Sequence, residues 1–192
     1  MFKNKKQKAQ VSAPFELLVA IIVMVFVIIA GTYALQNLSE NTCLGNKRQD
    51  FSNLISALRD VVLGSDLAYR NIEFTTKACY NESYERTYLK QETDRAVCER
   101  FCGSGSSCIL LYYEYIDEAR YEYKYPIQPV CTYLPTNIVF EDSKINCGID
   151  DDSREEVLNI IDPNAKIPSG SYKIYKSSSS GQIHNICFVK IR

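Results

Sequence analysis

The chain has eight cysteines, which could form disulfides with one another or hold a metal. All eight follow residue 42. In an exported domain an even number of cysteines is typical of a disulfide framework, here of up to four bonds whose pairing the sequence leaves open. Zinc is the alternative, but a second close cysteine pair is missing and the one histidine, His184, has no nearby partner. We therefore expect disulfides and no metal site; the candidates are Cys43, Cys79, Cys98, Cys102, Cys108, Cys131, Cys147 and Cys187.

Nucleophilic catalysis has little support in the sequence. A nucleophile needs a neighbouring base, and the chain has one histidine and no GxSxG motif. The stretch GSGSSC that begins at Gly103 lacks the Lys-Ser/Thr of a phosphate-binding loop and lies beside cysteines. We expect a structural turn there, no cofactor and no enzymatic activity.

Consecutive acids in GIDDDSREE could offer oxygen ligands to calcium, namely Asp150, Asp151, Asp152 and Glu155. An EF-hand loop instead alternates its acids and has a glycine at the sixth position. Ser153 and Glu156 match a capping box. We therefore expect a helix over residues 152–162 in place of a calcium site.

Tyrosine is unusually frequent, with fourteen residues and no tryptophan, and six of the tyrosines fall in residues 112–125. In an extended strand Tyr121, Tyr123 and Tyr125 share one face. That face could contact a sugar or a neighbouring subunit through its amphipathic rings. The alternative, which we favour, is that it lines the domain's own half-buried surface, because aromatic residues are ordinary strand formers.

A stretch without charge runs from residue 17 to residue 35. At about 1.5 Å of rise per residue it spans roughly 28 Å, close to the hydrocarbon thickness of a bilayer. The first eight positions contain four lysines and no acidic residue, so the positive-inside rule predicts a cytoplasmic N-terminus. We expect a single-pass protein of the cell membrane whose remaining chain is extracellular.

The remaining chain has the composition of an exported surface. It is mildly acidic and has no basic cluster that could neutralise several phosphates, which excludes nucleic acid as a partner. Asn37 and Asn81 each lie two positions before a serine and are candidate glycosylation sites.

Glu16 is the one acidic residue in the first 35 positions. Together with Pro14 it falls in the first turn of the predicted membrane helix. Proline is tolerated there, and a carboxylate meets the positive end of the helix dipole. Helix geometry alone is therefore sufficient to explain its place.

Beyond the membrane segment, apolar residues spaced by three and four predict an amphipathic helix over residues 48–63, ended by Gly64. The sequence leaves open whether this helix continues the membrane helix without interruption or is separated from it by a break at Gly45. A second helix is expected over 92–103, with Gly103 at its end. Alternating tyrosine-rich runs predict a hairpin over 108–127. Further strands are expected at 84–89, 130–134, 137–141, 171–176 and 185–191, the last two joined by a hairpin loop.

The N-terminal segment resembles the class III signal peptide of archaeal type IV pilins and pilin-like proteins. The resemblance rests on the lysine-rich leader, on Lys8-Ala9 followed by Gln10, on Glu16, and on the long apolar helix. It implies that a prepilin peptidase cuts between Ala9 and Gln10, so that the helix stays on the mature chain. It also implies that Glu16 pairs with a neighbouring subunit's amino group during assembly. Family members usually have this glutamate as the fifth mature residue, whereas here it would be the seventh.

These observations predict an α+β protein whose N-terminal transmembrane or filament-core helix precedes a disulfide-rich domain with an amphipathic helix and an antiparallel sheet. The expected parts are a leader at 1–9, the apolar helix at 10–35, a helical stem at 36–65 and the exported domain at 66–192. The expected function is that of a minor or accessory subunit of an archaeal type IV pilus-like filament on the cell surface. The alternative is a monomeric membrane-anchored adhesion module for a glycan or protein.

Overall fold

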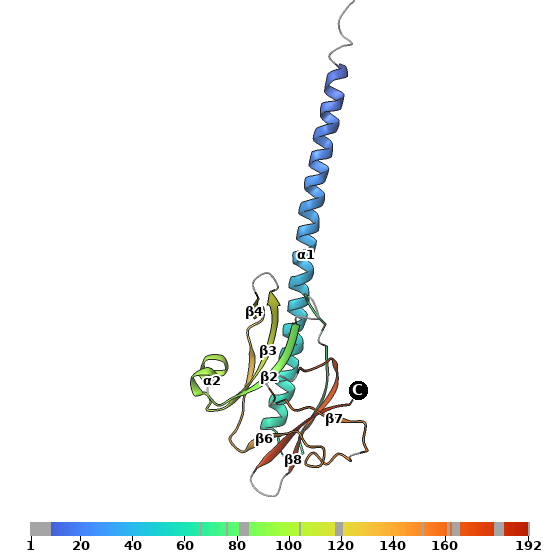
Figure 1. Cartoon of the computed structure of the whole chain (residues 1–192). Helices are drawn as coiled ribbons and strands as arrows, with labels where there is room; N and C mark the ends of the chain where they lie inside the picture. Colours follow the sequence, from blue (N-terminus) through green and yellow to red (C-terminus); the bar gives the residue numbers. More distant parts are fainter. Residues whose placement is uncertain are drawn as a thin grey trace, which may run out of the picture. The chain divides into compact units, whose positions relative to one another are not determined.

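The computed structural model (Figure 1) describes residues 9–65, 67–75, 77–80, 85–103, 105–117, 121–150, 152–160, 162, 166–178 and 183–191. The chain divides into two compact units, Met1–Thr42 and Cys43–Arg192. It has the α+β composition that the sequence predicts, with one long helix, two sheets and four disulfides.

The long helix α1 (Ala9–Leu63) contains the predicted apolar and amphipathic segments in one element. Gly45 lies inside it, so the helix runs without a break through the position where a kink was an open alternative. The prediction that Pro14 and Glu16 lie in the first turn is wrong, because α1 begins at Ala9, its first turn holds no acidic residue and Pro14 lies inside the helix. Without an N–H, Pro14 leaves one backbone hydrogen bond of the second turn unmade. By length and composition α1 is able to cross a membrane, and its most apolar stretch is not buried against the rest of the described chain.

The first sheet has five strands in the order β1-β8-β9-β6, with β7 paired to β9. All pairs are antiparallel except β6 with β9, which is parallel. The predicted hairpin between β8 and β9 is confirmed, although its tip lies outside the described residues. The strands are β1 (Tyr69–Phe74), β6 (Ile138–Glu141), β7 (Glu156–Val157), β8 (Gly170–Ser178) and β9 (His184–Lys190).

The second sheet has four antiparallel strands in the order β2-β3-β4, with β5 on the other side of β3. Its β3-β4 pair is the hairpin predicted over residues 108–127. The strands are β2 (Glu85–Glu92), β3 (Cys108–Asp117), β4 (Glu122–Lys124) and β5 (Val130–Tyr133).

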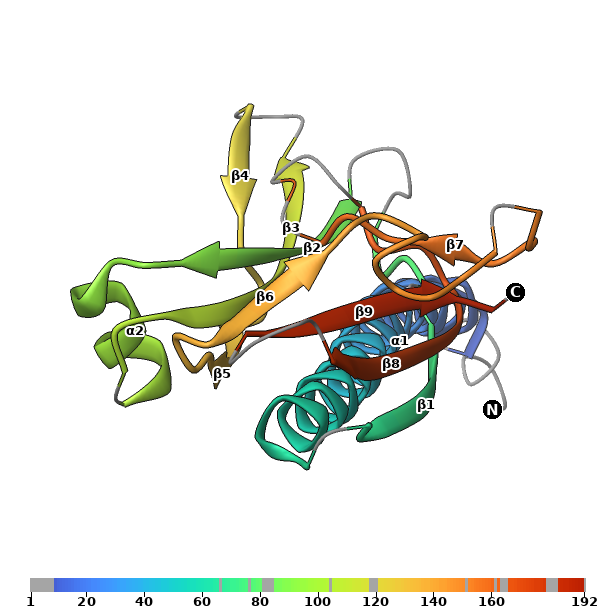
Figure 2. The same ribbon diagram turned by 90° about the horizontal axis from the view of Figure 1, so that it is seen from below.

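The core of the Cys43–Arg192 unit forms between the end of α1 and both sheets (Figure 2). Side chains of α1 spaced by three and four positions are almost fully buried, as the amphipathic pattern predicts. They meet buried residues from alternating positions of the strands, whose side chains point to one face. The principal members are Phe51, Leu54, Leu58, Val61, Leu89, Leu111, Tyr113, Tyr172, Ile174 and Phe188.

The short helix α2 (Arg95–Cys102) confirms the helix expected before Gly103. Asp94 caps its start by accepting a hydrogen bond from the Ala96 amide at 2.8 Å. Gly103 ends it in the left-handed conformation, with φ at 77°, which glycine adopts without a Cβ penalty.

The helix predicted over residues 152–162 is wrong. The segment instead forms the short strand β7, which pairs with β9. The Leu158 amide continues the pairing by donating to the Phe188 carbonyl at 2.8 Å. Ser153 still accepts a hydrogen bond from the Glu155 amide. The backbone that follows pairs with the edge of β9 and does not form a helix. Local capping chemistry was therefore overridden by a sheet edge distant in the sequence.

All eight cysteines form disulfides, as predicted. One bond joins α1 to the segment before β2, two join α2 to the second sheet, and one joins the loop before β7 to β9. The pairs are Cys43–Cys79, Cys98–Cys108, Cys102–Cys131 and Cys147–Cys187.

Candidate functional site

The outer face of the second sheet gathers aromatic and charged side chains from three strands. Because side chains alternate along a strand, Arg86 and Tyr88 of β2 share this face with Tyr112 and Glu114 of β3. The register places Arg86 opposite Glu114 and Tyr88 opposite Tyr112. We define the tyrosine face as these four residues together with Tyr123 and Tyr125. Tyr123 lies in β4, and Tyr125 follows the end of that strand.

A buried carboxylate organises the tyrosine face. Glu114 is 1% exposed and accepts hydrogen bonds from Arg86 Nε and, at 3.1 Å, from Tyr88 Oη. A buried carboxylate needs such partners, because an unpaired charge in this position would be costly. Burial, the nearby Glu114 charge and the hydrogen bond all raise the pKa of Tyr88, so this phenol keeps its proton to a higher pH than an ordinary tyrosine.

The aromatic rings pack in a continuous series. Tyr88 and Tyr112 stack with ring centroids 5.2 Å apart, and Tyr125 meets Tyr112 edge-on at 6.2 Å. The Arg86 guanidinium lies 5.0 Å from the Tyr88 ring and 5.5 Å from the Tyr123 ring. The Arg86 guanidinium therefore contacts two aromatic rings while it is ion-paired with Glu114.

The three tyrosines singled out in the sequence are more exposed than a half-buried face requires. Tyr123 and Tyr125 are 55% and 53% exposed, and Tyr121 is 87% exposed. Tyr121 lies in the turn before β4 with φ at 54°, so it does not share the strand geometry expected for all three. Arg86, Tyr88 and Glu114 could not be identified from the sequence, because only the register of β2 against β3 shows that they lie side by side.

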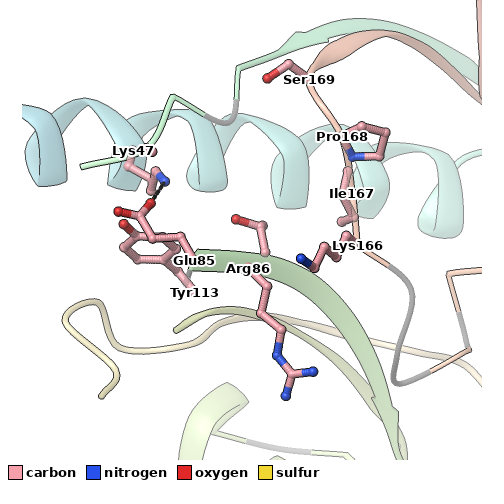
Figure 3. Close-up of a pocket in the computed structure, with 10 residues that line it drawn as sticks. Lys47, Glu85, Arg86, Tyr113, Lys166, Ile167, Pro168 and Ser169 are labelled. Carbon is pink, nitrogen blue, oxygen red and sulfur yellow. Dashed lines mark hydrogen bonds and ion pairs between the residues drawn. The ribbon is translucent and has the colours of Figure 1, made fainter. Parts of the chain in front are cut away.

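A second polar cluster joins α1 to the second sheet (Figure 3). Lys47 is 4% exposed, and its Nζ lies 3.5 Å from Glu85 Oε2 and 3.8 Å from the centroid of the Tyr113 ring. Glu85 also accepts hydrogen bonds from the backbone amides of Cys79 and Tyr80. Burial lowers the pKa of Lys47, an effect that the Glu85 charge opposes.

The Lys47–Glu85 pair borders an open cavity of about 360 Å³. In Figure 3 Lys47 and Glu85 point toward one another, whereas the Arg86 side chain points away from this cavity and belongs to the tyrosine face. A lysine that is paired with a carboxylate and covered by a ring is held in place, and its geometry fits a clamp between helix and sheet. The sequence analysis did not identify this pair.

The remaining predicted site residues are spread along the chain. Glu16 and Asn37 are exposed on α1, at whose beginning Ala9 and Gln10 lie; Asn81 and Asp151 fall outside the described residues. His184 begins β9, where it pairs with Ile138 of β6. Among the residues that the structure describes, no three metal-ligating side chains lie close enough together to hold a metal ion.

The exposed apolar side chains gather on the first part of α1. Every large apolar side chain from Phe15 to Ile29 is at least 42% exposed. The whole of the most apolar stretch is unburied, in contrast to the core helix of a globular domain. By length and composition this part of α1 could span a membrane.

No family model matches the chain. No curated protein and no solved structure matches it either. The function must therefore be argued from the chain's own residues.

Proposed function

We propose that this protein is a minor or accessory subunit of an archaeal type IV pilus-like surface filament, anchored and assembled through the apolar part of α1. The observation that carries the proposal is the exposed apolar surface between Phe15 and Leu35. Four disulfides favour an oxidising compartment outside the cytoplasm for the Cys43–Arg192 unit. No catalytic role is proposed.

The free energy gained by removing these apolar side chains from water supports a permanent apolar environment for this segment. Thirteen large apolar side chains are exposed between Phe15 and Ile29. Fully burying one such side chain contributes about 1.5 to 3 kcal/mol. Their combined removal from water is therefore worth on the order of 20 kcal/mol, which lipid or the helices of other copies can supply.

Glu16 is the residue that separates a filament subunit from a plain membrane anchor. It is exposed within the apolar surface, and a carboxylate in lipid is stabilised by an opposite charge. After the proposed cut between Ala9 and Gln10, the amino group of a neighbouring copy would supply that charge.

Substitution of Glu16 tests this proposal in the full-length chain. Glu16→Ala should leave the protein in the membrane fraction but reduce the amount of assembled filament at least about tenfold, as loss of a buried charge partner predicts. Glu40→Ala is the matched control, since it removes a carboxylate from α1 outside the apolar segment. Unchanged assembly in Glu16→Ala would contradict the filament role.

The tyrosine face favours a second candidate function, that of a membrane-anchored module binding a glycan or protein. Its exposed rings and the Arg86 guanidinium could hold sugar hydroxyls or a partner's polar groups. Binding to a glycan array should fall at least about tenfold in Tyr123→Ala, since removing a contact ring is worth about 1.4 kcal/mol or more. Tyr121→Ala, in the neighbouring turn, is the matched control. Equal binding by both variants would exclude the face as the contact site.

A further inference from the structure

The Cys43–Arg192 unit carries its negative charge in one segment. Residues 141–156 contain seven acidic and two basic residues, a net charge of −5. The whole unit has 21 acidic and 18 basic residues, a net charge of −3, so the rest of it is net positive. The net negative charge of the unit is therefore concentrated in this segment.

The acidic side of the unit is exposed and held in place. Asp142, Asp150, Asp152 and Glu156 are exposed. The Ser153 amide donates to the Asp150 carbonyl at 2.9 Å, and Lys144 Nζ donates to the Ser153 carbonyl at 2.9 Å. Within the described part of the chain, Asp150, Asp152, Glu155 and Glu156 form no ion pair. Their charges are therefore available to a partner.

The basic side is an open groove of about 800 Å³ beside α1. Arg48 and Arg59 of α1 line it together with Tyr125, Pro126 and Pro129. Eleven positions separate the two arginines, which places them on one face of the helix about 16 Å apart along its axis. Both are exposed, and among the described residues neither forms an ion pair.

The two charged surfaces lie on opposite sides of the unit. The groove is lined by the end of α2 and the segment after β4, and the acidic segment leads into β7. Figures 1 and 2 both show α2 and β4 on the left and β7 on the right. Because the elements that carry the two surfaces lie on opposite sides of the unit, both surfaces cannot meet the same partner copy in one closed pair. Contact between unlike surfaces is head-to-tail, and copies joined in this way form a closed ring or an open filament.

We propose that Asp150, Asp152, Glu155 and Glu156 of one copy bind the Arg48–Arg59 groove of the next. The occupant of the groove is a second copy because the same unit presents the matching charge, unpaired and on its opposite side. This inference rests on the proposed function, and it gives the filament a contact outside the apolar part of α1. An acidic glycan or an acidic segment of another protein would be a different occupant, which the test below distinguishes.

A cross-linking experiment on the full-length chain in membranes tests the contact. A photo-reactive benzophenone amino acid replaces Ser52, which is exposed on the helical face between the two arginines. Copies labelled with ¹⁴N and ¹⁵N are mixed so that mass spectrometry separates bonds between copies from bonds within one copy. The expected product joins position 52 of one copy to the 150–156 peptide of another.

Charge reversal supplies the controls. R48E/R59E alone and D150K/D152K alone should each reduce this cross-link at least about tenfold, since like charges then face one another. Mixing the two variants should restore it, because each offers the charge that the other lacks. K77E/K173E changes two exposed lysines elsewhere on the unit and should leave the cross-link unchanged. Raised salt should weaken the wild-type contact.

Each outcome has one meaning. Cross-links from position 52 to a glycan or another protein, or copy-to-copy cross-links that persist in both reversed variants, would overturn the inference. A second probe at Ile22 of the apolar segment keeps this result separate from the proposed function. Cross-links between copies at Ile22 but none at position 52 would reject only the head-to-tail contact, whereas none at either position would reject the filament as well.

Discussion

The two ends of α1 are both rich in apolar residues, yet they have opposite environments. Ile22 and Phe26 in the first part are 48% and 70% exposed, whereas Leu54 and Leu58 in the last part are 1% and 0% exposed. The last part has one apolar stripe, which the sheets of the same chain cover. The first part is apolar on all sides, and no element of the described chain covers it. The apolar stripe in the last part is thus covered by strands of the same chain. The first part, which is apolar on all sides, requires lipid or another molecule to cover it.

The sharpest test of this comparison is the same truncation at both ends. Leu58→Ala should lower the free energy of unfolding of the Cys43–Arg192 unit by about 2 to 5 kcal/mol, because it opens a cavity in the core. Ile22→Ala should leave that free energy unchanged and should weaken only membrane retention or assembly. Denaturant unfolding followed by near-ultraviolet circular dichroism measures the first effect. Equal destabilisation by both substitutions would show that the two ends share one core.

The disulfide near the start of the packed part of α1 should have the next largest effect. Cys43–Cys79 closes a 36-residue separation and Cys98–Cys108 a separation of 10. In the chain-entropy model, replacing both cysteines by serine costs about 4 kcal/mol for the first bond and about 3 kcal/mol for the second. Thermal unfolding of the two double variants compares them. A smaller loss for the Cys43–Cys79 variant would indicate that this bond does not restrain the helix.

Alkaline pH should loosen the core that covers the last part of α1. Burial, aided by the charge of Glu156, raises the pKa of Tyr172 to about 12. The unfolded phenol loses its proton near pH 10, so between these values the folded state holds the proton more tightly and stability falls as pH rises. The loss attributable to Tyr172 is about 1 kcal/mol by pH 11. Urea midpoints between pH 8 and 11 should decline less steeply in Tyr172→Phe; identical slopes would exclude this contribution.

The smallest expected effect concerns Gly45, which lies between the two ends of the helix. A Cβ at this position meets no atom within 4 Å, so Gly45→Ala should be accommodated. Alanine in a helix interior is favoured over glycine by about 0.5 to 1 kcal/mol, and we expect a gain of that size in unfolding experiments. A loss of stability would indicate that the helix bends or opens at this point.

Features set by local spacing could be predicted from the sequence. The stripe around Leu58, the end of α2 at Gly103 and the β3-β4 hairpin all follow from residues close together in the chain. Full use of the cysteines in disulfides was predicted as well, but their pairing was not, because it depends on which strands become neighbours.

Features that depend on distant pairing could not be predicted. Ser153 and Glu156 match a helix-capping pattern, but the segment pairs with the edge of β9 and forms the strand β7 instead. The tyrosine face needed the register of β2 against β3 to bring Arg86 beside Glu114. The parallel pairing of β6 with β9 likewise could not be predicted, because nothing in either segment's sequence indicates that the other is its partner.

The most direct test of the account is the intact mass of the protein purified from membranes or surface filaments, measured after the disulfides are reduced. The account predicts a chain that begins at Gln10 and retains the apolar part of α1. A freely soluble product that begins beyond Leu35 would contradict it, because the exposed apolar surface on which the proposed function rests would then be absent from the working molecule.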